Sequence, residues 1–261
     1  MGHTRIGRLN RSQKWKDVVS AFCAGAGTEQ ISRQVLNAVE QAFNAEALSQ
    51  DAGYQKAVEL LVQMGIAAQS KDFVKHMRDC GISLSDHPTV QDLNAGLMQA
   101  IDDALWEKSS SGSMLGEYAK NALCQTVSLC VRNERSQELP GLIYRPDIEV
   151  FNTFGQRANF ADLNQNFIAK TFSNGLKAYI AQILPNLTGT DIHLASTHEV
   201  KAAYDAMDKH CLETAMVHRV YANDWLGKHQ YQLKDMDKQN IMKHANFMVK
   251  KMMRALKYGK D

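Results

Sequence analysis

The side chains best suited to chemistry lie close together in the segment 208–218. His210, Cys211, Glu213 and His218 combine imidazoles, a thiol and a carboxylate, which serve elsewhere as nucleophiles, acid–base groups and metal ligands. Cys211 and His218 are seven residues apart, so on one helix they lie about 10 Å apart, too far for a thiol–imidazole pair. The neighbours His210 and Cys211 point about 100° apart on a helix, which excludes that pair as well.

A metal site is the second chemistry open to this segment. His210 and Glu213 are three residues apart and share a helical face, with Asp208 and His218 nearby. Metal sites in helical bundles use Glu-x-x-His twice on facing helices, and neither Glu-x-x-His nor His-Glu-x-x-His occurs in the chain. We therefore expect one buried histidine that is hydrogen-bonded in the core, several surface histidines, no metal and no cofactor. His210, Cys211, Glu213 and His218 are kept as the alternative catalytic or metal site.

The segment VVSAFCAGAGTEQ, residues 18–30, has the form of a dinucleotide-binding turn, with an apolar run, two glycines and then a helix. The third glycine of that motif is replaced by Gln30, and the apolar residues follow a helical spacing from Trp15. A nucleotide-binding crevice also needs a parallel sheet, and no later β-branched run supplies a partner strand. We therefore interpret Gly25 and Gly27 as a turn between two helices.

The elements that would position these groups are helices. Only four prolines occur in 261 residues, apolar residues recur at spacings of three and four, and alternating β-branched runs are nearly absent. The sequence therefore predicts an all-α, multi-helix bundle of about nine helices. The expected helical segments are 12–22, 28–48, 54–66, 70–80, 85–106, 114–132, 146–154, 160–184, 198–226 and 235–258. Gly81 is expected to end one of them and Pro185 another.

Residues 136–146 contain Pro140, Gly141 and Pro146 and are expected to be irregular, so they mark the best boundary between two parts of the chain. The predicted division is a basic N-terminal arm (1–11), an N-terminal helical half (12–135) and a C-terminal helical half (147–261). The two halves form either two packed domains or one.

The helix expected at 198–226 carries a sustained heptad seam, which predicts burial against other helices. The seam consists of Val200, Tyr204, Met207, Cys211, Thr214, His218, Tyr221 and Trp225. The last helix is also amphipathic, with an apolar face and a basic face. Its segment carries five methionines, at positions 236, 242, 248, 252 and 253, which indicate adaptable packing such as a subunit contact.

Charge is concentrated at the two ends of the chain. Residues 1–16 hold five bases and no acid, and residues 228–261 hold nine bases and three acids, whereas residues 17–227 hold 16 bases and 25 acids. The basic ends either dock on the acidic body of the same or a sister chain, or meet a polyanion. The candidate partner- or polyanion-binding residues are Arg5, Arg8, Arg11, Lys14, Lys243, Lys250, Arg254 and Lys257.

The remaining features narrow the class of protein. Five cysteines without a Cys-x-x-Cys pair argue against a disulfide framework or a four-cysteine zinc site. No apolar run is long enough for a membrane span or a signal peptide, so a cytoplasmic location is expected.

Three functions follow. The leading one is a non-enzymatic subunit or adaptor of a multiprotein assembly, with other protein subunits, or copies of itself, as partners. The alternatives are a nucleic-acid-binding accessory protein that uses both basic ends, and an enzyme with its site near His210, Cys211, Glu213 and His218.

Overall fold

The structure is a computed structural model that describes residues 13–108, 113–136, 146–187, 197–229 and 238–259. Within these ranges all regular structure is helical, which confirms the predicted all-α class. The helices are α1 (Gln13–Cys23), α2 (Thr28–Val39), α3 (Ala45–Gln50), α4 (Ala52–Ala67), α5 (Phe73–Asp79), α6 (Val90–Lys108), α7 (Met114–Ser136), α8 (Asp147–Phe151), the 3-10 helix η1 (Asn152–Gly155), α9 (Arg157–Leu187), α10 (Thr197–Thr214), α11 (Met216–His229) and α12 (Lys238–Tyr258).

Two segments that were expected to be single helices are each divided into two. The run expected over 28–48 is interrupted after α2, and Asn44 restarts it as α3 by accepting a hydrogen bond from the Ala47 N–H at 2.9 Å. A side-chain oxygen at this position satisfies one of the unpaired N–H groups at a helix start. The helix expected over 198–226 is divided between α10 and α11 at Ala215.

The break at Ala215 has a partner on α9. The Gln165 side chain, which is buried, donates a hydrogen bond to the carbonyl of Leu212 at 3.0 Å. In an uninterrupted helix that carbonyl accepts from the N–H of Met216. Gln165 therefore stabilises an ending of α10 that local sequence periodicity does not reveal, and the predicted heptad seam is not one straight surface.

Three other helix boundaries test the sequence rules. Gly81 follows α5 with φ +86°, as expected for a glycine just past a helix end. The helix expected to begin at residue 70 begins at Phe73, because Asp72 caps it: the Asp72 carboxylate accepts from the Lys75 N–H at 2.9 Å. Pro185 was wrongly expected to end α9, which continues to Leu187; a proline removes only one backbone donor, and α9 ends shortly after it.

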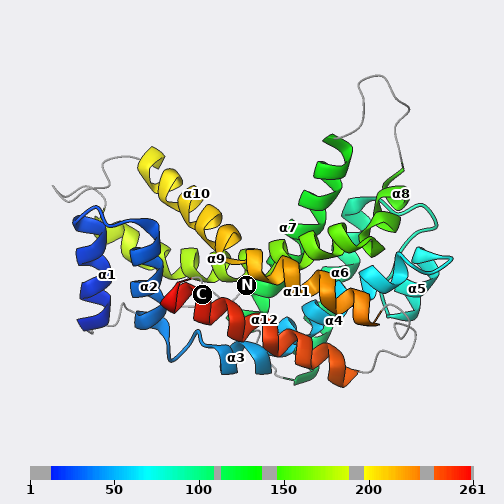
Figure 1. The fold of residues 1–261 in the computed structure, drawn as a ribbon, viewed down its shortest axis with the longest axis horizontal. Coiled ribbons are helices and arrows are strands. Elements are labelled where there is room, and N and C mark those ends of the chain that lie inside the picture. Colours follow the sequence, from blue (N-terminus) through cyan, green and yellow to red (C-terminus); the bar gives the residue numbers. More distant parts are fainter. Residues whose placement is uncertain (1–12, 109–112, 137–145, 188–196, 230–237, 260–261) are drawn as a thin grey trace.

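The long helix α9 is the axis of the fold (Figure 1). It packs along α7, α10 and α11, while α4 packs against α6, α7 and α12. Buried side chains from both predicted halves form one continuous core. Within this core the Tyr54 ring on α4 stacks on Phe167 of α9, and the Tyr54 hydroxyl donates to the carbonyl of Ala245 on α12 at 3.0 Å.

Within the predicted N-terminal half, α4 and α7 meet at one very close approach of backbones. A Cβ atom placed on Gly53, at the start of α4, would lie 2.6 Å from the Cα of Gly116, at the start of α7. A Cβ atom on Gly116 would in turn lie 2.8 Å from the Leu105 side chain. Because neither backbone can move aside as a side-chain tip can, these glycines allow α4 and α7 to touch directly.

Candidate functional site: a basic surface on the last helix

Helix α12 is amphipathic in the register that the sequence predicts. Its apolar residues Ile241, Ala245, Met248 and Met252 are buried in the core. Burial of this face is the main stabilising term for such a helix, at about 25 cal/mol per Å² of apolar surface. Met248, Met252 and Met253 are buried in the core of the chain itself, so these three methionines pack within the chain.

The opposite face of α12 carries the predicted cations. Lys243, Lys250 and Arg254 are exposed. Their spacings of seven and four residues keep them on one face of the helix, over about 17 Å of its length. Tyr258, at the end of the same helix, is also largely exposed. This face therefore offers three cations and one aromatic ring to solvent.

The two basic ends of the chain converge on one carboxylate. Lys257, in the last turn of α12, donates to Glu40 at 2.6 Å, and Lys14, in the first turn of α1, lies 3.8 Å from the other oxygen of Glu40. The hydrogen bond from Lys257 is the largest cause of a lowered pKa at Glu40. Figure 1 shows the end of α12 beside α2. The predicted arm residues Arg5, Arg8 and Arg11 lie outside the described residues.

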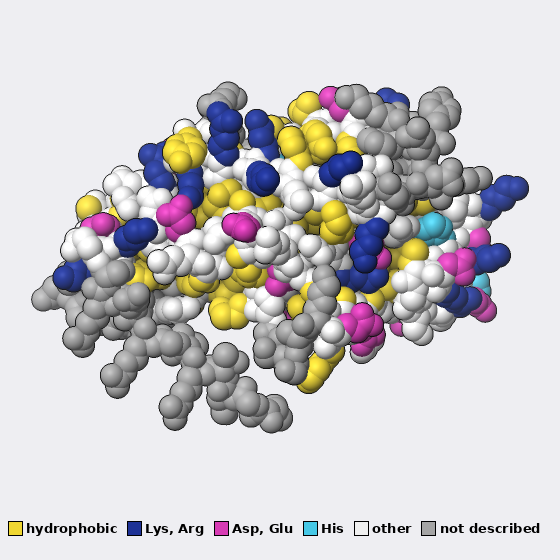
Figure 2. Space-filling model, turned by 90° about the horizontal axis from the view of Figure 1, so that it is seen from below, with side chains coloured by type: hydrophobic (Ala, Val, Ile, Leu, Met, Phe, Trp, Pro, Cys, Tyr) yellow, Lys and Arg dark blue, Asp and Glu magenta, His cyan; other side chains and the backbone are white. Residues whose placement is uncertain are grey.

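Figure 2 views the side of the molecule on which α3 and α12 lie. Lys and Arg side chains are interspersed with hydrophobic side chains on this face, and several Asp and Glu side chains also lie among them. Cations beside apolar side chains are common in protein–protein contacts, where apolar area adds to charge complementarity.

The alternative site near Cys211 is arranged for packing. Cys211 is fully buried, and burial raises the pKa of its thiol well above the usual range, whereas nucleophilic cysteines have lowered pKa values. His210 and Glu213 do lie together, with Glu29 of α2, around a hollow of about 280 Å³. Within the described ranges, no group of three or more His, Cys, Asp or Glu side chains is placed to hold a metal ion.

Among the residues whose burial the structure describes, two histidines are buried where one was expected. The Nε2 of His244 lies 2.8 Å from Asn164 Oδ1 and therefore donates to it. His218 is 1% exposed, and neither of its ring nitrogens has a hydrogen-bond partner within the described part of the chain. Its ring packs edge-on against Phe247, at a centroid distance of 6.5 Å. The expectation of a hydrogen-bonded core histidine thus fits His244 and was wrong for His218.

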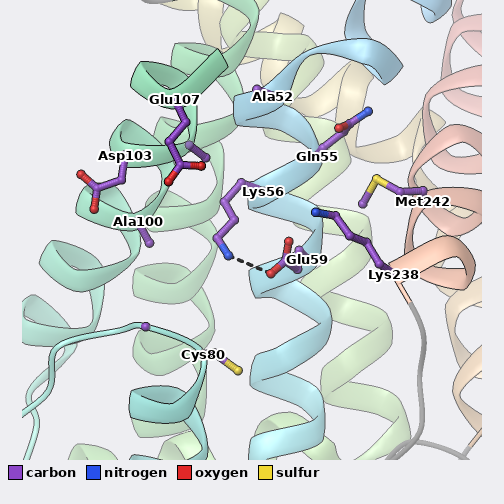
Figure 3. A pocket seen from close by; sticks show the side chains of 12 residues that line it. Ala52, Gln55, Lys56, Glu59, Cys80, Ala100, Asp103, Glu107, Lys238 and Met242 are labelled. Carbon is purple, nitrogen blue, oxygen red and sulfur yellow. Dashed lines mark hydrogen bonds and ion pairs between the residues drawn. The ribbon is translucent and has the colours of Figure 1, made fainter. Parts of the chain in front are cut away.

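A charged cavity of about 330 Å³ lies between α4, α6 and the start of α12 (Figure 3). Lys56 and Glu59 form an ion pair at 2.7 Å on α4, and Asp103 and Glu107 line the cavity from α6. Lys238 of α12 completes the lining on the far side. Because Lys56 already has a neighbouring counter-ion, the arrangement is that of a hydrated charge network and does not single out one ligand.

Comparison with protein-family models, with curated proteins and with solved structures gave no significant match. No helix of the described part has the length and apolar character needed to cross a membrane. Sequence reasoning found the basic face of α12 but missed Glu40, because no local pattern distinguishes this glutamate from other surface acids.

Proposed function

We propose that this chain is a non-enzymatic helical adaptor that binds an acidic partner protein through a basic surface on α12 and the start of α1. The basic surface consists of Lys14, Lys243, Lys250, Arg254 and Lys257. One observation carries the proposal: Lys243, Lys250 and Arg254 are exposed on one face of α12, and Glu40 joins that face to the start of α1. The basic arm 1–11, which carries Arg5, Arg8 and Arg11, precedes α1 in the chain.

The charge distribution supports an acidic partner. The surface combines exposed lysines and an arginine with Tyr258, and aromatic residues and arginine are enriched in protein interfaces. Glu40 occupies only one end of the surface, where it neutralises part of the charge of Lys14 and Lys257. Lys243 and Lys250 lie further along α12 and are exposed, so they supply charge to a partner.

The test compares two triple variants with equal loss of charge. Lys243→Gln/Lys250→Gln/Arg254→Gln removes the exposed part of the surface, and Lys71→Gln/Lys75→Gln/Lys201→Gln removes three exposed lysines elsewhere. In capture from extracts of the native host, the first variant should lose the partner by at least about tenfold relative to wild type, which corresponds to roughly 1.4 kcal/mol. The second variant should retain the partner. Retention by both variants would overturn the proposal.

Nucleic acid is the competing partner, and the same experiment identifies it. Nuclease treatment before capture should leave an acidic protein partner bound. Loss of the partner after nuclease, together with binding of the purified chain to a 20-base-pair duplex, would replace the adaptor proposal. A duplex partner would also give an affinity that falls steeply with salt, because phosphate contacts release counter-ions.

A further inference from the structure

A second cavity, of about 510 Å³, lies where the junction of α10 and α11 faces α7 and α9. Its apolar lining comes from Leu129, Phe154, Leu212 and Met216. Leu212 and Met216 are exposed, so the apolar wall reaches the surface. A volume of this size is within the range of small-molecule sites, which combine an apolar lining with a few placed polar groups.

Gln165 is the most buried polar group in this lining, with 5% of its surface exposed. Its side-chain nitrogen is committed, because Nε2 donates to the Leu212 carbonyl and lies 3.0 Å from both that oxygen and the Met216 sulfur. Its Oε1 accepts no hydrogen bond from the described residues. Gln165 therefore offers a held acceptor oxygen that solvent or a ligand can reach, and that oxygen can accept a hydrogen bond from a ligand.

The neighbouring amides are oriented in the same sense. Asn159 Nδ2 donates to Glu134 at 3.1 Å and to the Thr153 carbonyl at 3.2 Å, and Asn166 Nδ2 donates to the Asp162 carbonyl at 2.8 Å. Both N–H groups of Asn159 are used within the protein, so Asn159 offers only its carbonyl oxygen to a ligand, whereas Asn166 offers its carbonyl oxygen and one remaining N–H. The polar wall is thus rich in acceptors.

The charged side chains of the described residues that line the cavity are two carboxylates and one guanidinium. Asp162 and Glu134 contribute carboxylates, and Arg219 contributes one guanidinium, which pairs with Asp162. Burial raises the pKa of Asp162 even though Arg219 acts in the opposite direction. A carboxylate that has lost hydration in this way is stabilised further by an additional positive charge. The Arg219–Asp162 ion pair is an example of a cationic group bound at this side of the cavity.

We infer that this cavity binds a small organic cation, in which an ammonium or guanidinium group bonds to Asp162, Gln165 and their neighbouring acceptors while an apolar portion lies against Leu129, Phe154 and Met216. The ligand shares Asp162 with Arg219 or displaces it. Selectivity comes from charge and hydrogen-bond direction, because a carboxylate ligand of the same shape would face acceptors and like charges. The inference is independent of the proposed docking function. That function uses the basic surface on α12 and the start of α1, and none of its residues lines this cavity.

The test uses three probes with the same ring, namely phenethylamine, phenylacetate and 2-phenylethanol. Titration calorimetry of the full chain, supported by the NMR signals of its side-chain amides, should give saturable binding of phenethylamine in the millimolar range or tighter. Phenylacetate should bind at least about tenfold more weakly, and 2-phenylethanol should fall between them.

Variants separate a site from general charge effects. Asp162→Asn should weaken phenethylamine binding by at least about tenfold, because it removes the carboxylate charge that attracts the ammonium group. Asn133, an exposed lining residue, allows two opposite changes: Asn133→Asp should tighten binding several-fold and Asn133→Lys should weaken it. Asp86→Asn is the matched control, because Asp86 also pairs with an arginine, Arg78, but lies outside the cavity. Thermal unfolding of each variant verifies that it is folded.

Three results would overturn the inference: phenylacetate binding as tightly as phenethylamine, binding of the amine that is unchanged by both Asp162→Asn and Asn133→Lys, or no saturable binding of any of the three probes.

Discussion

Lys257 Nζ lies 2.6 Å from Glu40 Oε1, although 217 positions separate the two residues. Lys14 approaches the other oxygen of the same carboxylate, so the first and last described helices share one counter-ion at the end of α2. The basic ends were expected either to dock on an acidic surface of the protein itself or to meet a polyanion. Lys14 and Lys257 pair with Glu40 of the same chain. Lys243, Lys250 and Arg254 are exposed along the outer face of α12, where a partner can reach them.

The first prediction concerns this shared counter-ion. Glu40→Gln should lower the free energy of unfolding at pH 7 by less than about 1 kcal/mol, because Glu40 is half-exposed and the pair is screened by solvent. The pKa of Glu40 is lowered in the folded state, so its contribution is present above the unfolded pKa and is lost as the pH falls through the folded pKa. Urea unfolding should therefore show a difference at pH 7 that shrinks as the pH falls below the usual pKa of a glutamate. Glu107→Gln, also on an exposed glutamate, should show neither effect.

The second prediction concerns His218. Burial is the largest cause that lowers its pKa to about 4, and the charge of Lys251 acts in the same direction. The unfolded chain binds a proton near pH 6.5 that the folded chain binds only near pH 4, so stability should fall as the pH drops through this interval, by about 3 kcal/mol. His218→Leu should abolish most of that fall, as measured by urea unfolding at pH 7, 5.5 and 4.5.

At pH 7 His218→Leu should be neutral or stabilising, because it replaces two ring nitrogens without partners by hydrocarbon. His87→Leu, which removes an exposed imidazole, is the matched control and should leave the slope of stability with pH unchanged. A large loss of stability in His218→Leu at pH 7 would contradict this prediction, because it would mean that the His218 ring makes a stabilising hydrogen bond in the folded chain.

The third prediction concerns the contact of α4 and α7. Gly53→Ala places a methyl group 2.6 Å from the Gly116 Cα, so the helices must separate. Overpacking of this kind typically costs about 1–3 kcal/mol, which should outweigh the gain in helix propensity. Gly27→Ala is the control, because nothing lies within 4 Å of its added Cβ. Thermal unfolding should show a lower midpoint for the first variant, and an equal midpoint for both would refute direct backbone contact.

The fourth prediction concerns the alternative enzyme site. Cys211 is fully buried and its thiol pKa is raised, so iodoacetamide should leave it unmodified in the folded chain and modify it after urea unfolding. Mass spectrometry of peptides gives the modified fraction at each cysteine. Rapid modification of native Cys211 would indicate an accessible thiolate and would return the segment 208–218 to the candidate catalytic sites.

The sequence by itself determined the fold class, the amphipathic register of α12 and the helix end at Gly81. These features depend on spacing, on local side-chain volume and on backbone freedom, all of which are encoded within a few residues. The basic character of both ends is likewise a property of composition. The same local rules missed the division of 28–48 into two helices. Asn44 is a favourable N-cap residue, but a favourable cap residue starts a new helix only where the packing of the chain also favours a turn.

Only the tertiary structure decided which distant groups meet. The break at Ala215 depends on Gln165, nearly fifty positions away, and the neutralisation of Lys257 depends on Glu40, more than two hundred positions away. The cavity with its oriented acceptors also exists only once α7, α9 and the α10–α11 junction have packed. Polar contacts of this kind leave no period in the sequence, because each needs one residue placed at one point in space and no repeating pattern along a helix.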